Sequence, residues 1–289
     1  MVVDTTQEAR VIGETDFTSG PTTLHPKAIY IVEGKLYQVE RLDFEGRKAF
    51  VREIDCDYYT TAITYSKVTP IDEFAHEESR SHGEVHVVSR VVGFKKIKFY
   101  TNENVGSGEL DLPEQQMHTT AYWLTVPASV MALLPYASDD RRDGVVGLAF
   151  ALKQVAQLLL MCDGHDIGIS ISGFGVGDSG FGQDTSAMAD PDSRITNPDG
   201  IKVFIYDNYP GGIGFSAPLF QMHDELVRST RHLIADCQCE SGCPGCVGPI
   251  GNTGPLAKAA ALRILDLLLE HAPQIAARAA TEDAEVQAF

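Results

Sequence analysis

Basic residues are scarce in this chain of 289 residues, which has 23 Lys and Arg against 40 Asp and Glu and a net charge of −17. A chain with this balance does not carry the broad basic surface that binds nucleic acid non-specifically, so any DNA contact must be local. No run of eighteen or more uncharged apolar residues occurs, and the first residues lack the basic and apolar segments of a secretory signal. These absences predict a cytoplasmic protein that does not contact a membrane.

Motifs of several enzyme classes are absent as well. The sequence has no Gly-Lys-Ser/Thr triplet of a phosphate-binding loop, no Asp-Glu-x-His tetrapeptide and no Gly-x-Ser-x-Gly motif. Its composition is nevertheless that of a globular protein, with 44% hydrophobic and 22% charged residues, and its length supports a sizeable core with two subdomains. Low-complexity tracts and internal repeats are not evident.

Alternating apolar and polar residues with glycine at the turns characterise the first half. The runs AIYIVEG, KLYQVERLDFEG and RKAFVREI predict a meander of hairpins, and EVHVVSRVVGFKKIKFYT and TTAYWLTVP predict further strands. About six short strands in this span predict a small barrel or sandwich. We therefore expect an extended lead-in over residues 1–26 and a β-rich subdomain over residues 27–135.

The pattern changes after Pro135, where a long and mostly apolar helix is predicted with Ser138 as its N-cap. Short β-branched runs at 166–172 and 202–207 are typical of interior strands, and helices are predicted at 216–235 and 255–270. Residues 173–200 are predicted to form a solvated acidic loop, since six acids and one base lie between Asp166 and Gly200. Residues 136–289 form the second predicted domain, an α/β half.

Four of the six cysteines, Cys237, Cys239, Cys243 and Cys246, lie within ten residues. Disulfide scaffolds spread their cysteines through short secreted chains, whereas this crowding in a long chain indicates a metal site. Four thiolates suit tetrahedral zinc and leave no position for water, so the site is predicted to be structural. An iron–sulfur cluster is the rival, although ten residues are few for a cubane, and a reactive dithiol is a third possibility. The sequence predicts one structural Zn²⁺ in an α+β protein whose β-rich half precedes it.

A glycine-rich segment, YDNYPGGIGFS, joins a predicted strand to a predicted helix. The backbone amides near Gly211, Gly212 and Gly214 could converge on an anion at a helix N-terminus. The alternative, which we favour, is a tight turn in which glycine permits close packing and Asp207 caps or braces the backbone.

Aromatic and basic residues alternate in the run GFKKIKFYT. In a strand, Phe94, Lys96, Lys98 and Tyr100 share one face, where rings could stack on unpaired bases and lysines could contact phosphates. An edge strand whose lysines discourage aggregation is an equally good interpretation. DNA binding here is therefore a hypothesis for weak contact with a single strand.

The segment MCDGHDIG brings Asp163, His165 and Asp166 together after a predicted helix. A metal or catalytic role is a remote alternative, because Asp and Gly at a helix end commonly serve the backbone and Cys162 is of the kind found in cores.

The chain resembles a family of bacterial DEAD/DEAH-box helicases whose eponym is mitomycin repair factor A. The resemblance lies in VIGETDFTSGPTTLHPKAIYIVEGKLYQVERLD, REIDCDYYT and FKKIKFYTNENVGSGELDLPEQQMHTTAYWLTVP, and in YDNYPGGIGFS followed by CQCESGCPGC. It covers essentially the whole chain and identifies it as similar to the family's C-terminal, zinc-binding region. In that case the four clustered cysteines are the zinc ligands.

The resemblance also implies a DNA-repair context and 3′→5′ DNA translocation by the full-length family. The family's two RecA-like motor domains carry a Walker A lysine and a D-E-x-H box, which this chain lacks, so by itself it is not expected to hydrolyse ATP by that mechanism. The expected partners are DNA and RecA-like helicase domains, in cis or in trans. Alternatively, the chain is a stand-alone scaffold subunit beside a separate helicase in a repair or phage-defence complex.

Overall fold

The computed structural model describes residues 1–174, 200–248 and 253–270. These residues form two compact units, of which the first contains Met1–Ser66 and Val88–Gln116. The second contains Lys67–Val87 and the described residues from Met117 onward. Two long strands, β6 (Tyr58–Glu77) and β7 (Arg80–Lys98), contribute residues to both units. The units are therefore interleaved along the chain, unlike the consecutive blocks 1–26, 27–135 and 136–289 that the sequence suggested.

A five-stranded sheet in the order β2-β1-β5-β4-β3 forms the centre of the first unit. Its strands are β1 (Val2–Asp4), β2 (Arg10–Gly13), β3 (Ile29–Val32), β4 (Lys35–Asp43) and β5 (Lys48–Ile54). The hairpins β3–β4 and β4–β5 follow the predicted turns, and the alternation buries Tyr37, Val39, Ala49 and Val51. The sequence pattern therefore identified this part of the sheet.

The first 26 residues differ from the predicted lead-in, because they contain β1, β2 and the short helix α1 (Gly20–Thr23). The strand β1 pairs with β2 in antiparallel fashion and with β5 in parallel, so that Val2 lies opposite Ala49. A pairing across more than forty residues leaves no local pattern in a strand of three residues, which explains why the prediction missed it.

A second sheet has the order β10-β11-β9-β7-β6, with β8 (Asn104–Glu109) paired to β7. The strands β6 and β7 have 20 and 19 residues, far more than the short strands predicted. The start of β6 is rich in Thr, Ile and Tyr, which favour a continuous strand. Pro70 is tolerated because β6 is the last strand of the sheet, where a missing N–H breaks no ladder.

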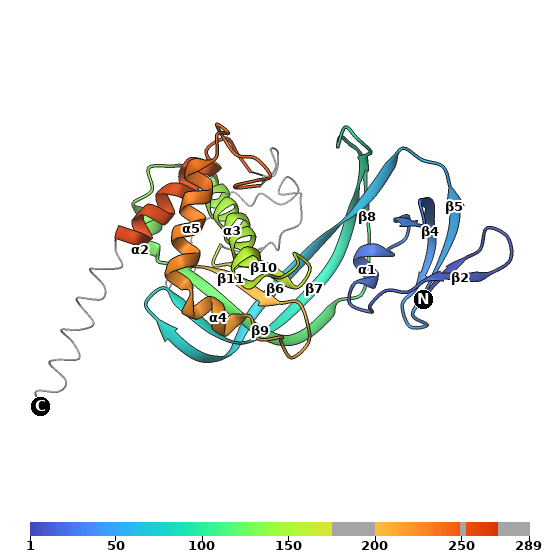
Figure 1. The fold of residues 1–289 in the computed structure, drawn as a ribbon, viewed down its shortest axis with the longest axis horizontal. Helices are drawn as coiled ribbons and strands as arrows, with labels where there is room; N and C mark the ends of the chain where they lie inside the picture. The colour runs from blue at the N-terminus through green and yellow to red at the C-terminus, as the bar shows by residue number, and fades with distance from the viewer. Residues whose placement is uncertain (175–199, 249–252, 271–289) are drawn as a thin grey trace, which may run out of the picture. The chain divides into compact units, whose positions relative to one another are not determined.

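The main core lies in the second unit, where helices cover β9 (Gln115–Val126), β10 (Ile167–Ser172) and β11 (Ile201–Asp207). Figure 1 shows α3 (Ser138–Leu160) beside α5 (His223–Asp236) over these strands. Both faces of β9 are buried: Tyr122 and Leu124 belong to the core under the helices, and Ala121 and Trp123 to a smaller cluster on the other face. The predicted α+β class is confirmed. In this sheet, β10 pairs with β11, β11 with β9 and β7 with β8, each in antiparallel fashion.

The helices agree with the sequence in kind and differ in detail. Ala137, and not Ser138, is the N-cap of α3, and the helix predicted at 216–235 is divided into α4 (Ser216–Gln221) and α5 at Met222. The remaining helices are α2 (Ala128–Ala132) and one over residues 257–270.

Within the described ranges, α3 is the one helix long and apolar enough to cross a membrane, and half of that stretch is buried inside the structure. The predicted acidic loop falls largely on 175–199, outside the described residues.

Candidate metal centre

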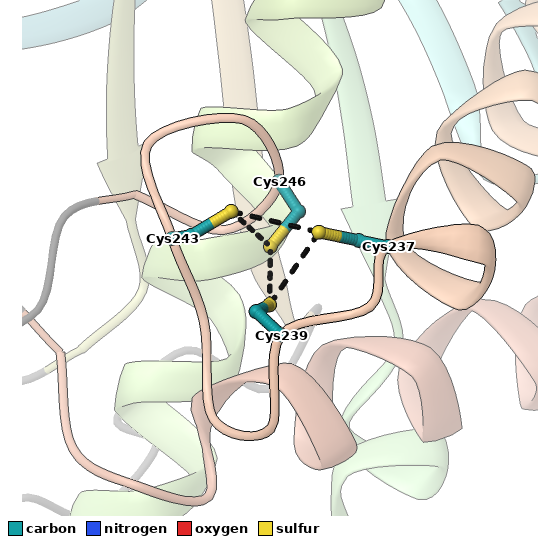
Figure 2. A group of neighbouring side chains, drawn as sticks. All are labelled: Cys237, Cys239, Cys243 and Cys246. Atoms are coloured by element: carbon teal, nitrogen blue, oxygen red, sulfur yellow. Dashed lines mark hydrogen bonds between the residues drawn. The ribbon is translucent and has the colours of Figure 1, made fainter.

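The four clustered cysteines follow α5 directly and bring their sulfur atoms together. Cys237 ends the helix in an extended conformation, and the chain then folds back so that all four side chains point toward one centre (Figure 2). The Sγ atom of Cys237 lies 3.5 Å from that of Cys239 and 3.5 Å from that of Cys243. The Sγ atom of Cys246 lies 3.4 Å from that of Cys239 and 3.7 Å from that of Cys243.

These separations can be compared with those that zinc requires. Four sulfur atoms about 2.3 Å from a tetrahedral zinc ion are about 3.8 Å from one another. The four measured separations are 3.4 to 3.7 Å, and all four ligand atoms lie within 4.8 Å of one another. A small contraction separates this arrangement from a zinc shell, so the donor set fits one structural Zn²⁺.

The loop depends on glycine at Gly242, between the two cysteine pairs. Its φ of +142° is unfavourable for other residues, and an added Cβ would lie 2.6 Å from a methyl group of Val247. The second half is a tight turn in which the backbone N–H groups of Cys246 and Gly248 both donate to the carbonyl oxygen of Cys243, at 3.0 and 3.1 Å. The turn places Cys243 and Cys246 on the same side, toward the first pair.

Packing against α3 anchors the loop in the core of the second unit. Cys246 and Val247 are buried, and a Cβ at Gly147 of α3 would lie 2.9 Å from the Cβ of Val247. One turn earlier, a Cβ at Gly144 would lie 2.5 Å from the Cβ of Ala260 in the helix over residues 257–270. The two glycines therefore let the cysteine loop and the last described helix approach α3 closely.

Lys258 is a second feature of the site, and sequence reasoning missed it. Its Nζ donates to the carbonyl oxygens of Cys237 and Cys239, both at 2.6 Å, while the residue is only 9% exposed. Four thiolates and Zn²⁺ carry a net charge of −2, so a buried ammonium beside the loop offsets part of this charge. The sequence did contain a signal for this role: the lysine lies within the apolar run PLAKAAAL, and a lysine that is buried with such a run needs a partner.

The thiols differ in acidity because their surroundings differ. Hydrogen bonds to its sulfur, first from the backbone N–H of Cys239 and then from the side chains of Cys239 and Cys243, lower the pKa of Cys237 to about 7. Burial raises the pKa of Cys246 to about 12. Zinc binds thiolates, so metal binding displaces the protons that such thiols hold and couples affinity to pH.

Replacing Lys258 by methionine tests the role of the ammonium. We expect zinc to remain at one equivalent but its affinity to fall about 10- to 100-fold, the range for loss of a partner that orients metal ligands. Competition with a chromophoric chelator measures this affinity. The control is Arg263→Met on the same helix, whose exposed guanidinium pairs with Glu270 at 3.5 Å and should leave zinc affinity unchanged. Equal affinities in the two variants would contradict the role assigned to Lys258.

The predicted glycine-rich turn has a carboxylate at its centre. Asp207, at the end of β11, is 1% exposed, and its Oδ2 accepts the backbone N–H groups of Ile213, Gly214 and Phe215 at 2.6, 2.8 and 3.3 Å. The hydroxyl of Thr120 donates to the same oxygen at 3.1 Å. The converging amides that could hold an external anion thus already bind a side chain of the chain itself.

The three glycines of this turn have φ of +83° at Gly211, +75° at Gly212 and +93° at Gly214, conformations that favour glycine. A Cβ on Gly212 would lie 2.5 Å from the hydroxyl oxygen of Thr120. The geometry accords with the bracing role for Asp207, and an anion site here stays a hypothesis.

The residues of the predicted nucleic-acid face are separated in the structure. Phe94 is 2% exposed and stacks on His25 with ring centroids 5.0 Å apart, so its ring is not available to a base. A register irregularity between Lys96 and Ile97 interrupts the alternation, and β7 ends at Lys98. Tyr100 lies beyond the strand with a φ of +69° and is fully exposed. The prediction that all four residues share one exposed face is therefore wrong for Phe94.

The segment after α3 forms a surface turn. The carboxylate of Asp163 accepts the backbone N–H of His165 at 2.8 Å and contacts its ring nitrogen at 2.7 Å, while Asp166 accepts the N–H of Asp163 at 2.8 Å. These bonds satisfy the backbone at the helix end, as the simpler interpretation expected.

Comparison with known proteins places this geometry in a family. Residues 148–247, which include all four cysteines, match the family described as the MrfA Zn-binding domain. The chain carries an MrfA zinc-binding domain. It is similar to the ATP-dependent helicase YprA of Bacillus subtilis, 34% identical over 263 residues and 89% of the chain. It is more distantly similar to the helicase HRQ1 of Saccharomyces cerevisiae, 21% identical over 93% of the chain.

Solved structures extend the likeness to the fold. A crystal structure of the DUF1998 helicase MrfA bound to DNA matches 92% of the chain at 32% identity with a TM-score of 0.58. A second crystal structure of MrfA matches 92% at 27% identity with a TM-score of 0.58. The chain spans 32% of YprA, 25% of HRQ1 and 33% of the MrfA chain. It therefore corresponds to the zinc-binding, C-terminal region of these helicases, with one structural zinc as its cofactor.

Proposed function

We propose that the chain acts as the accessory zinc-binding region of a cytoplasmic DNA-repair helicase, where it supports DNA engagement and packs against RecA-like domains. The observation that carries the proposal is the four-sulfur centre within a region whose likeness to MrfA continues over nearly the whole chain. The MrfA relative has been crystallised bound to DNA. Translocation in the 3′→5′ direction would belong to the helicase as a whole, with the RecA-like domains in cis or in trans.

The zinc centre has a structural role in this proposal. Its four protein ligands complete a tetrahedral shell, so zinc cannot bind a reacting water without losing a cysteine. The centre joins α5 to the helix over residues 257–270 through Lys258, and it fixes the loop against α3. The zinc therefore holds three helices in a fixed arrangement on which partner domains can pack.

DNA contact requires a local basic surface because the net charge of the chain is −17. With Phe94 buried, the proposed surface consists of Lys96, Lys98 and Tyr100, in the first unit. The Nζ of Lys96 lies 4.8 Å from the ring centre of Tyr58, and that of Lys98 lies 3.7 Å from a carboxylate oxygen of Asp57. The two lysines could contact phosphates while the exposed Tyr100 ring stacks on an unpaired base.

Reversing two charges tests this surface. Lys96→Glu with Lys98→Glu should abolish the weak binding of the chain to a fluorescent single-stranded oligonucleotide and flatten its salt dependence, because phosphate contacts are lost. Fluorescence anisotropy at several salt concentrations measures both effects. Zinc content and melting temperature should be nearly unchanged.

The matched control is Lys35→Glu with Arg52→Glu, which makes the same change of charge in the same unit. Lys35 and Arg52 also have acidic partners, at 3.0 and 2.9 Å. Binding that falls equally in both double variants would indicate a general charge effect. Binding that is unchanged in the Lys96 and Lys98 variant would contradict the proposed surface and favour the alternative, a scaffold subunit that docks proteins in a repair or phage-defence complex.

A further inference from the structure

Two histidines from neighbouring strands face each other in the second unit. Both are more than a hundred residues before the cysteine loop in the sequence. His86 lies on β7 between the buried residues Val85 and Val87, and His118 lies on β9, the next strand of the sheet. Their ring centroids are 5.1 Å apart and the rings are inclined by 69°. Glu84, two residues before His86 and thus on the same face of β7, has a carboxylate oxygen 3.6 Å from Nδ1 of His118.

This part of the sheet is open to solvent. Burial along the shared face of β9 decreases from Tyr122, which is completely buried, to His118, whose side chain is 65% exposed. The carboxylate of Glu84 is 41% exposed. An ion can therefore reach the histidine pair, and substitution of His118 removes no core contact.

We propose that His86, His118 and Glu84 form a second metal site, which binds a divalent transition-metal ion such as Zn²⁺ reversibly. Imidazole nitrogen together with carboxylate oxygen is a donor set that zinc, copper and nickel accept. The proposal concerns a site separate from the four cysteines and does not depend on the proposed function in DNA repair.

The ring separation supports the proposal. An imidazole nitrogen lies about 2.0–2.1 Å from zinc and about 1.1 Å from its ring centre, so two rings at a tetrahedral angle have centres about 5.2 Å apart. The measured separation is 5.1 Å. The two rings therefore have the separation expected of imidazoles that bind one zinc ion.

Glu84 would complete the set by rotation of its side chain. Within the described residues, the four cysteines are the one group of three or more possible metal ligands whose donor atoms all lie within 4.8 Å of one another. The carboxylate of Glu84 contacts His118 and needs to turn toward the ion between the rings. A site of two nitrogens and one oxygen has fewer protein ligands than the cysteine centre, and its side chains are partly exposed, so we expect its ion to exchange more readily than zinc in the cysteine centre.

The test counts metal ions in zinc-replete protein from which any histidine tag has been removed. Equilibrium dialysis against Zn²⁺ should find one further equivalent beyond the tightly held zinc. His118→Ala should weaken this second equivalent about a hundredfold, because it removes one of the two imidazoles and leaves only His86 and Glu84 as donors. In the parent protein, imidazole NMR signals of His86 and His118 should shift on zinc addition, while the cysteine-bound zinc is retained throughout.

The matched control is His165→Ala, which removes another exposed histidine whose Nδ1 lies 2.7 Å from a carboxylate oxygen, that of Asp163. This variant should bind the second equivalent as the parent does. A parent that takes up no second equivalent would overturn the proposal. So would a second equivalent that survives both His118→Ala and His86→Ala unchanged, since the ion would then lie elsewhere.

Discussion

Replacing Cys246 by serine is expected to abolish stoichiometric zinc binding and to prevent the second unit from folding stably. Structural zinc contributes about 10–16 kcal/mol of apparent binding free energy in small zinc domains, as much as the whole stability of many domains. Cys246 is completely buried, so the serine hydroxyl would also lie in the core without the metal as its partner. Elemental analysis of protein purified without added metal and thermal unfolding followed by circular dichroism measure the two effects.

Cys56→Ser is the control, because Cys56 lies in the first unit and its Sγ contacts the carbonyl oxygen of Tyr58 at 3.3 Å. It should retain one zinc per chain and nearly the parent melting temperature. A Cys246→Ser variant with a full zinc equivalent and parent stability would contradict the assignment of this ligand. Iron with a visible charge-transfer band in the parent protein would show that the cysteines hold an iron–sulfur cluster and not zinc.

The contrast between the cysteines and Lys258 explains what the sequence could predict of the site. The four ligands lie within ten residues of the chain, so their spacing and ligand type predict a metal site and favour structural zinc over the iron–sulfur and dithiol alternatives. Lys258 lies 12 residues after Cys246 in the sequence, and it contacts the same loop because its helix packs closely against α3. Such a contact depends on how two helices approach, and no local spacing encodes it.

The fold shows the same limit on a larger scale. Alternation identified the strands β3, β4 and β5 and their hairpins, because a residue pattern of period two marks the two faces of a strand. It did not reveal that Phe94 is buried, since His25, whose ring stacks on that of Phe94, comes from a distant segment. It also did not show where β6 and β7 pass from one compact unit to the other.

Asp207→Ala is expected to produce the second largest effect, through the turn between β11 and α4. The variant leaves three backbone N–H groups and the hydroxyl of Thr120 without their acceptor. Hydrogen bonds to charged groups contribute about 1.5–3 kcal/mol each, and their loss in a partly buried turn should lower the free energy of unfolding by at least about 3 kcal/mol. For a unit of this size, that corresponds to a decrease in melting temperature of about 6–12 °C.

Asp207→Asn is the matched variant, since an amide oxygen can occupy the position of Oδ2 and accept the same N–H groups without the negative charge. Its destabilisation should be smaller than that of the alanine variant. If the two variants melt at the same temperature as the parent, the carboxylate does not brace the turn.

Added anions distinguish the brace from the anion site considered from the sequence. In the parent protein, the carboxylate of Asp207 already accepts the amides of Ile213, Gly214 and Phe215, so millimolar phosphate or acetate should not change the melting temperature. In Asp207→Ala the same amides are free, and a small carboxylate such as formate or acetate should restore part of the lost stability by mass action. Stabilisation of the parent by phosphate, with no rescue of the alanine variant, would instead establish the glycine-rich turn as a binding site for an external anion.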